Sequence, residues 1–167
     1  MTAHAVRLES AGASVTVVST DRAVTDWTAR YFDPWWKAAE VPSDSVCAGA
    51  VVTAAVDTSQ YDDVAFKVTQ APHTSAEYAR AQLLVARDAS AGTVRAASPK
   101  QALAYRSEPG VGRLDVFGCH TEDVATATAR LAREVMRGQL LRAGWAVLHA
   151  SAVVGEGGCT VLTLEGC

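Results

Sequence analysis

The pattern of apolar and polar residues along the chain predicts many short strands. Residues 5–9 and 14–19 are rich in apolar and β-branched side chains, and the small residues between them suit a hairpin turn. Residues 46–56 form an apolar run that is typical of a buried strand. Further strands are predicted where Gly and Pro interrupt apolar stretches, at 82–87, 93–97, 101–107 and 113–117. The pattern therefore indicates a meander of antiparallel strands.

Three segments before residue 82 have weaker signals. The stretch PWWKAAEVPSDS, at 34–45, is predicted to be a loop in which one tryptophan closes an edge of the core and the other covers surface. The stretch DTSQYDD, at 57–63, is predicted to be a polar turn. Val64, Phe66 and Val68 then alternate with other residues, which predicts a half-buried strand before a break in APHTSA.

Two helices are predicted. The first is short, capped by Thr20 or Asp21 and stopped at Asp33-Pro34. The second runs from Thr121, which we expect to be its N-cap, to about Ala143. Apolar residues predict the buried stripe of each helix: Val24, Trp27 and Tyr31 in the first; Val124, Leu131, Ala132, Val135, Met136 and Leu140 in the second. The predicted fold class is α+β: a mostly antiparallel, strand-rich sheet with one short and one long helix, over residues 1–144.

Composition and charge exclude several classes of function. The 167-residue chain is 49% hydrophobic and 20% charged, which is typical of a folded domain. Its net charge of −3 and the absence of Lys/Arg runs argue against a nucleic-acid-binding protein. We expect no membrane segment, since no apolar run approaches a spanning length. The four widely spaced cysteines and the lack of a signal peptide favour free thiols and a cytoplasmic location. The richness in Ala, Val, Thr, Gly and Arg suggests a bacterial source.

The last residues, WAVLHASAVVGEGGCTVLTLEGC, carry the functional signal. Residues 147–154 and 159–165 are predicted to be two strands joined by a glycine turn at 155–158. The second strand is apolar on both faces, which is typical of a central strand covered on both sides. A central strand that ends in glycine is how a phosphate-binding loop begins.

Residues 144–166, with GWAVLHASAVV, a tight turn and VLTLEG, resemble the start of the P-loop domain of the HPr kinase/phosphorylase-like proteins. In that family a strand with leucine, histidine and a small residue precedes a glycine turn, and the next strand delivers the first glycine of the Walker A loop. The resemblance implies that Gly166 is that cofactor-binding glycine and that His149 is the catalytic-region histidine. The remaining Walker A residues, the catalytic Asp and the magnesium ligands have no counterpart in this chain.

The resemblance implies that the chain is the N-terminal portion of an ATP- and Mg²⁺-dependent kinase that phosphorylates a hydroxyl of a protein, peptide or small molecule. Residues 145–167 would be the first strands of an incomplete P-loop domain, so we expect this chain alone to bind no ATP and to be inactive. With its last strand built for the middle of a sheet, we expect a homo-oligomer. The alternative is a non-catalytic module that recognises a protein or peptide partner. A Gly-Lys-[Ser/Thr] encoded after residue 167 would favour the kinase.

Overall fold

The computed structural model describes residues 2–33, 35–43, 49–78, 80–145, 150–154 and 160–164. The strands of the main sheet are β1 (His4–Ser10), β2 (Ala13–Ser19), β3 (Lys37–Val41), β4 (Ala50–Val56), β5 (His73–Tyr78), β6 (Ala81–Asp88), β7 (Thr93–Ser98), β8 (Leu103–Glu108) and β9 (Arg113–Gly118). The helices are α1 (Arg22–Phe32), α2 (Thr58–Gln70) and α3 (Thr121–Arg142), with short 3-10 turns η2 (Pro99–Gln101) and η3 (Pro109–Val111). The α+β class predicted from the sequence is confirmed.

The nine strands form one mixed sheet in the order β3-β1-β2-β4-β9-β8-β7-β6-β5. All neighbouring strands are antiparallel except for β2–β4 and β4–β9, which are parallel. The order of elements along the chain agrees with this pattern. Strands β2 and β4 are separated in the chain by α1 and β3, which leaves room for a parallel pairing, whereas tight turns join consecutive strands from β5 to β9 and make them antiparallel. The hairpin of β1 and β2 and the antiparallel run from β6 to β9 agree with the prediction.

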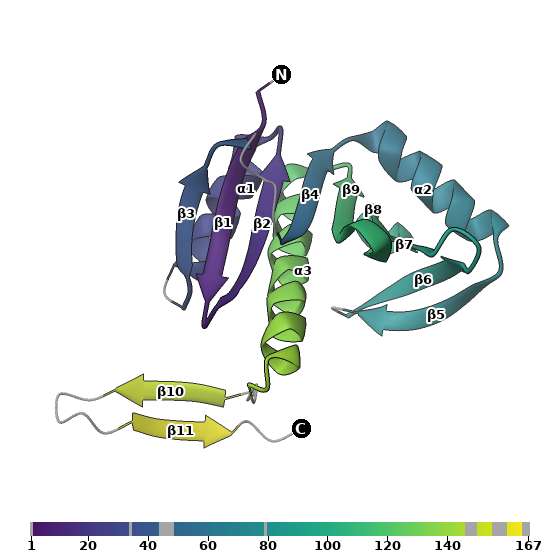
Figure 1. Ribbon diagram of the computed structural model, residues 1–167. Helices are drawn as coiled ribbons and strands as arrows, with labels where there is room; N and C mark the ends of the chain where they lie inside the picture. Colours follow the sequence, from purple (N-terminus) through teal and green to yellow (C-terminus); the bar gives the residue numbers. More distant parts are fainter. Residues whose placement is uncertain are drawn as a thin grey trace.

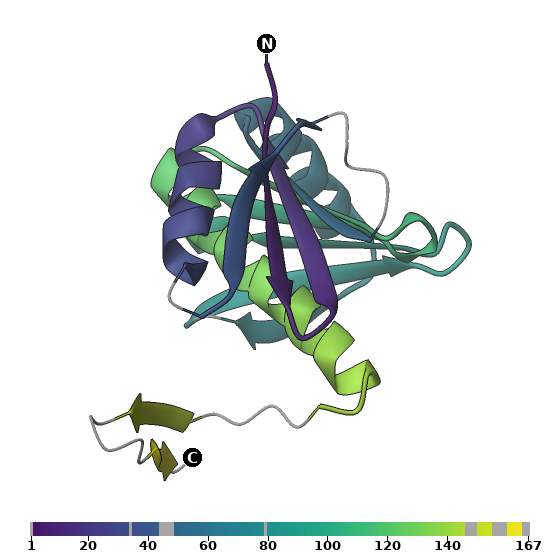
Figure 2. The same ribbon diagram turned by 60° about the vertical axis from the view of Figure 1, so that its left-hand side comes forward.

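The helices cover the sheet on both sides (Figures 1 and 2). We call the side that carries α1 and α3 the first face and the side that carries α2 the second face. Alternate residues of one strand prove the division: Val116 of β9 belongs to the hydrophobic core under α1 and α3, whereas its neighbour Phe117 packs with Val64 and Val68 of α2. The sheet is therefore the middle layer of three.

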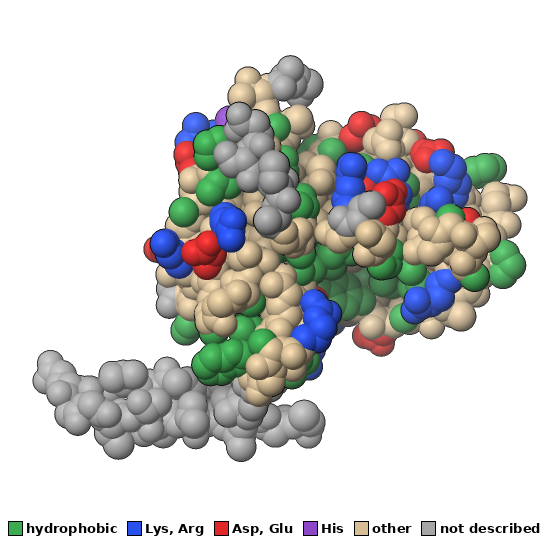
Figure 3. All heavy atoms as spheres, viewed as in Figure 1, with side chains coloured by type: hydrophobic (Ala, Val, Ile, Leu, Met, Phe, Trp, Pro, Cys, Tyr) green, Lys and Arg blue, Asp and Glu red, His purple; other side chains and the backbone are tan. Residues whose placement is uncertain are grey.

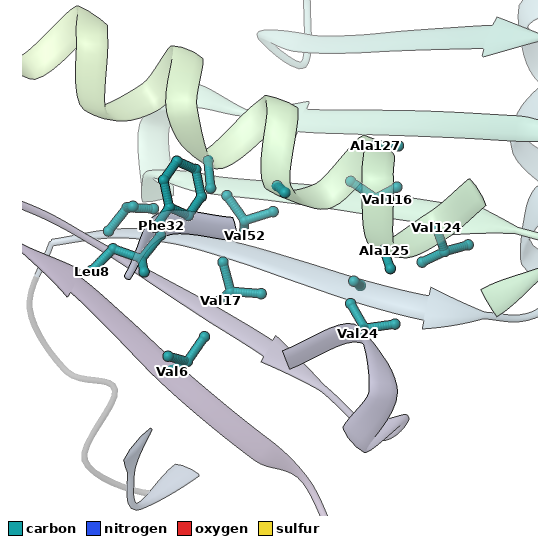
Figure 4. Close-up of a cluster of buried hydrophobic side chains, with 14 of the residues drawn as sticks. Val6, Leu8, Val17, Val24, Phe32, Val52, Val116, Val124, Ala125 and Ala127 are labelled. Atoms are coloured by element: carbon teal, nitrogen blue, oxygen red, sulfur yellow. The ribbon is translucent and has the colours of Figure 1, made fainter. Parts of the chain in front are cut away.

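The core of the first face is the larger one (Figure 4). Val6 and Leu8 of β1 and Val17 of β2 point from the sheet toward the helices, where they meet Val24 and Phe32 of α1. Helix α3 adds small residues, among them Ala125, Ala129 and Ala132, and the fully buried Met136. Small side chains let α3 lie close to both the sheet and α1.

The long helix α3 is confirmed, with two corrections. Its predicted stripe is only partly right, because Leu131, Val135 and Leu140 are half-buried at the edge of the core, whereas Val124, Ala132 and Met136 are buried. The N-cap is His120 rather than Thr121, whose hydroxyl instead donates a hydrogen bond to Oδ2 of Asp21 at 3.0 Å. That bond joins the first turns of α1 and α3.

Helix α1 also differs in its buried stripe. Asp21 is the N-cap, as the sequence allowed, and its side chain accepts a hydrogen bond from the Ala23 amide. Trp27 and Tyr31 are 39% and 37% exposed, so the predicted face lies about one position away from the buried one. Phe32 is buried instead. Of the two adjacent tryptophans, Trp36 stacks on Phe32 and Trp35 is 75% exposed, which confirms the interpretation that the two rings have different roles.

The strand predicted around Val64 is wrong, because residues 58–70 form α2. The side chain of Asp57, assigned to a polar turn, accepts a hydrogen bond from the Gln60 amide and caps this helix. Val64 and Val68 are four residues apart, so both helical and alternating patterns place them on one side. Phe66 separates the two hypotheses: it is 65% exposed, as the helix requires.

Two edge strands were also missed. Residues 37–41, predicted to be loop, form β3, and residues 73–78, which include part of the predicted break APHTSA, form β5. Both strands are largely exposed, since each pairs on one side only and no helix covers most of its side chains. The alternation of apolar and polar residues that marks a half-buried strand is therefore missing from their sequences.

The predicted C-terminal hairpin is present as β10 (Ala150–Val154) and β11 (Thr160–Leu164). They pair antiparallel, with Ala152 opposite Leu162, and form a two-stranded sheet of their own. A two-stranded sheet is at best marginally stable in isolation. They are not part of the nine-stranded sheet.

Candidate functional site

The two site residues predicted from the family resemblance, His149 and Gly166, lie outside the described residues. The same holds for the glycine turn at 155–158 and for the predicted strand start at 147–149. The structure therefore provides no geometry for a phosphate-binding loop, and the roles of His149 and Gly166 stay predictions. In the described ranges no three His, Cys, Asp or Glu side chains gather closely enough to hold a metal ion.

A polar hollow on the first face is the best candidate for a functional site. It lies beside α3, where the sheet extends beyond that helix, and its volume is about 240 Å³. Its walls come from four elements that are distant in sequence: Tyr78 of β5, Gln101 of η2, Leu103 and Tyr105 of β8, and Asp123, Thr126, Ala127 and Arg130 of α3. Four of these eight residues have neutral hydrogen-bonding side chains, and a fifth, Arg130, is a cation. Such a polar lining is unusual for a hollow that lies next to a hydrophobic core.

Strand register places the sheet residues of the hollow on one side. Leu103 and Tyr105 are two residues apart on β8, and Tyr105 is opposite Val116, a member of the first core. Tyr78 ends β5 opposite Ala81. On α3, Asp123, Ala127 and Arg130 recur every three or four residues and so share one face of the helix. The two-residue period of the strands and the three- to four-residue period of the helix therefore place these residues around one hollow.

The hydroxyl of Tyr78 is buried and makes no hydrogen bond with any described residue. Leaving a buried polar group without a partner costs about 1–3 kcal/mol. Burial and the nearby Glu134 carboxylate raise the pKa of Tyr78, while Arg133 and Arg130 act in the opposite direction. Tyr78 lines the hollow together with four residues of α3.

Tyr105 is the second phenol of the hollow. Burial raises the pKa of Tyr105 to about 12; Tyr78 adds to the shift and Arg130 opposes it. The hydroxyl of Tyr105 is therefore protonated and able to donate a hydrogen bond throughout the physiological pH range. Arg130 lines the same hollow as the two tyrosines.

Arg130 differs from the next two arginines of α3. Arg133 and Arg137 each form an ion pair with Glu134, at 3.3 Å in both cases. Arg130 is half-buried and forms no ion pair within the ranges that the structure describes. The acidic residue of the hollow, Asp123, is exposed in the first turn of α3, where the helix dipole stabilises it. The hollow thus has a cation with unused donors at one end.

Two other features of the surface are less suitable as sites. A second hollow of about 450 Å³ lies between α1 and the start of α3, and Arg30 covers the Trp27 ring there at 5.7 Å. On the second face, the fully buried carboxylate of Asp115 pairs with Arg106 at 2.7 Å and with Arg113 at 2.8 Å. These groups satisfy one another, so we assign the cluster a structural role. Figure 3 shows positive and negative side chains intermixed over the face in view, with no large patch of one sign.

Sequence reasoning missed the residues of the hollow. Tyr78 falls in a segment that was not assigned to a strand, and Tyr105 was assigned to a strand with no role. The one available signal was Arg130, a charged residue next to the buried positions Ala129 and Ala132 of the long helix.

Comparisons with known proteins give no match for this chain among family models, curated proteins or solved structures. Within the part of the chain that the structure describes, no helix has the length and apolarity needed to cross a membrane.

Proposed function

We propose that residues 2–145 form a recognition domain that binds a small polar ligand, or a polar group of a larger partner, in the hollow beside α3. The observation that carries the proposal is the Tyr78 hydroxyl: it is buried at the wall of a hollow with other hydrogen-bonding groups and has no partner among the described residues. Folded proteins satisfy most such groups, and those that are left over concentrate where a ligand or water completes them. A concave surface with a few convergent polar side chains is the usual form of a small-molecule site.

The mechanism of such a site is orientation. The side chains of Tyr105 and Gln101 offer hydrogen bonds from the sheet side, and Thr126 and Arg130 from the helix side. Leu103 and Ala127 supply apolar wall between them. Both sides rest on the first core, through the buried Leu103 and Ala127, so the donors are held in place before a ligand arrives.

The experiment blocks the hollow with a larger side chain. We expect the exchange Gln101→Trp to abolish the binding of polar fragments identified by NMR screening of the whole chain. The matched control is Lys100→Trp, the exposed neighbour in the same turn, which should leave binding intact. In the wild-type protein, the amide shifts caused by these fragments should map to β5, η2, β8 and α3. Fragments that bind elsewhere, or that bind Gln101→Trp as well as the wild type, would contradict the proposal.

The sequence of residues 144–166 supports a wider context, in which this domain precedes the ATP site of an HPr kinase-like phosphotransferase. On this proposal the parent protein uses ATP and Mg²⁺, and the recognition domain contributes to the choice of the phosphoacceptor. The presence of β10 and β11 as an antiparallel pair agrees with the predicted strand–turn–strand segment. Calorimetry of the 167-residue chain should detect no Mg-ATP binding, because a phosphate loop needs consecutive amides, a helix N-terminus and a lysine. Micromolar binding would contradict this placement of the ATP site.

A further inference from the structure

We propose that the hollow beside α3 is an anion site, in which Arg130 and Tyr105 bind the carboxylate or phosphate group of a small organic molecule. The inference rests on the proposed recognition function and narrows it to one ligand chemistry. It depends on three observations about the hollow. The first is a cation with no ion pair among the described residues, the second is a pair of phenols that line the same hollow, and the third is the small volume and partly apolar wall of the hollow.

The first observation is the charge of Arg130. A half-buried guanidinium has lost part of its hydration, and a carboxylate or phosphate group restores the lost interactions by accepting two parallel hydrogen bonds, one at each of two oxygens. Glu134, one turn further along α3, is the nearest candidate partner by spacing. Both of its carboxylate oxygens, however, are engaged by other arginines, Oε1 by Arg133 and Oε2 by Arg137. Arg130 is therefore available to a ligand.

The second observation is the pair of phenols. Tyr78, Tyr105 and Arg130 line the same hollow, and Arg130 opposes the rise in the pKa of both phenols. The Tyr105 hydroxyl is protonated throughout the physiological pH range, because burial raises its pKa to about 12, and it can therefore donate a hydrogen bond. The Tyr78 hydroxyl is buried at the wall of the same hollow and has no hydrogen-bond partner among the described residues. A cation flanked by phenol donors is chemistry that recognises an oxyanion.

The third observation limits the size and total charge of the ligand. A hollow of about 240 Å³ accommodates a compact molecule rather than a nucleotide. Leu103 and Ala127 form apolar wall, so the body of the ligand is apolar or weakly polar. Asp123 lies two helical turns from Arg130, roughly 10 Å along the axis, and repels a second anionic group at that end. The site thus selects one anionic group on a compact body.

The test uses probes that differ only in the anionic group: benzoate, phenyl phosphate and the neutral benzamide. They are titrated into the whole ¹⁵N-labelled chain, and the side-chain Nε–H signal of Arg130 is followed together with the backbone amides. We expect saturable shifts centred on Tyr78, Tyr105 and Arg130 with benzoate or phenyl phosphate, and at least tenfold weaker binding of benzamide. The stronger of the two anions identifies the ligand as a carboxylate or a phosphate.

Variants of the protein distinguish the effect of the Arg130 charge from the effect of the shape of the hollow. Arg130→Gln should weaken binding of the anion at least tenfold, whereas Arg142→Gln, an exposed arginine near the end of the same helix, should not change it. Tyr105→Phe should weaken binding several-fold. If Arg130→Gln fails to fold, the shift map of the wild type and the Tyr105→Phe variant decide the matter.

The outcomes distinguish the two proposals. Equal affinity of benzamide and benzoate, with shifts in the hollow, would overturn the anion site and leave the recognition function in place. Binding of the anions that Arg130→Gln does not weaken would also overturn it. No shifts in the hollow with any of these probes, together with a failed fragment screen, would contradict both proposals.

Discussion

The two faces of the sheet bury hydrophobic side chains to very different extents. On the first face, α1 and α3 lie side by side and enclose a core that extends over five strands. On the second face, α2 alone covers a small cluster around Val64, Val68 and Phe117. Beyond α2, the second face carries the ion pairs of Asp115. One sheet thus has a face that supplies most of the hydrophobic stability and another whose polar groups must compensate one another.

The difference explains where a site can form. The first face is covered by helices over β1, β2, β4 and β9, but the sheet continues past α3 to β5. The hollow lies at this boundary, where a rigid core ends and hydrogen-bonding side chains begin. On the second face the corresponding polar residues already have partners. We conclude that unpaired polar groups, rather than polarity itself, distinguish the candidate site.

The largest expected effect compares one substitution on both faces. Leu8→Ala should lower the free energy of unfolding by about 3–4 kcal/mol, because Leu8 is completely buried in the first core and the cavity cannot collapse. Leu84→Ala should cost only about 1 kcal/mol, because Leu84 is half-buried beside the second core and water replaces the lost side chain. Urea unfolding of both variants measures the difference.

This pair of variants can break the comparison directly. Equal losses of stability would show that the second core is as important as the first. A larger loss for Leu84→Ala would reverse the assignment of the two faces. The m-value of each variant should equal that of the wild type, so that the comparison reflects the native state.

The second prediction concerns the compensated charges of the second face. Asp115→Asn should cost about 2 kcal/mol, because it leaves Arg106 and Arg113 without their buried partner. Both arginines are partly exposed, at 28% and 48%, so the loss is smaller than for a fully buried pair. Thermal and urea unfolding at constant ionic strength measure it.

A second carboxylate near the same arginine provides the control. Glu108 lies 3.6 Å from Arg106 but is 42% exposed. Glu108→Gln should change stability by less than about 0.5 kcal/mol, since exposed ion pairs contribute little. If the two substitutions had the same effect, burial of Asp115 would not explain its importance.

Much of the fold could be predicted from the sequence, and the failures have a common cause. The hairpin of β1 and β2, the run of strands from β6 to β9 and the two helices α1 and α3 have clear apolar periodicity and turn residues. Helix α2 was mistaken for a strand because Val64 and Val68 satisfy both periods; the exposed Phe66 is what distinguishes them. The edge strands β3 and β5 are largely exposed, so their sequences lack the alternation of apolar and polar residues that marks a half-buried strand.

The candidate site was beyond prediction for a different reason. Tyr78, Tyr105 and Arg130 are each unremarkable in the sequence, and only the register of β5 to β8 and the docking of α3 bring them together. Arg130 also matters because it forms no ion pair within the described residues. Sequence spacing cannot reveal this, since Glu134 lies four residues further along the helix, where an ion pair with Arg130 would be expected. The sequence signal at His149 and Gly166 concerns a different site, and it stays a prediction.

The smallest expected effect tests how the hollow depends on the first core. The pKa of Tyr105 is raised to about 12 by burial, so the folded protein holds this proton more tightly than the unfolded chain, where the pKa is near 10. The stability from the neutral phenol is therefore fully present below about pH 10 and is lost as the pH rises toward 12. Between these values the wild type should lose on the order of 1–2 kcal/mol more stability than Tyr105→Phe, which has no proton to release.

In this measurement each protein's own stability at pH 8 is the reference, so that the contributions of titratable groups common to both proteins cancel. Chemical unfolding at intervals from pH 8 to pH 12 gives the two curves. If they stay parallel, the Tyr105 phenol is in contact with water, and the hollow is not the desolvated boundary of the first core from which the anion site was inferred.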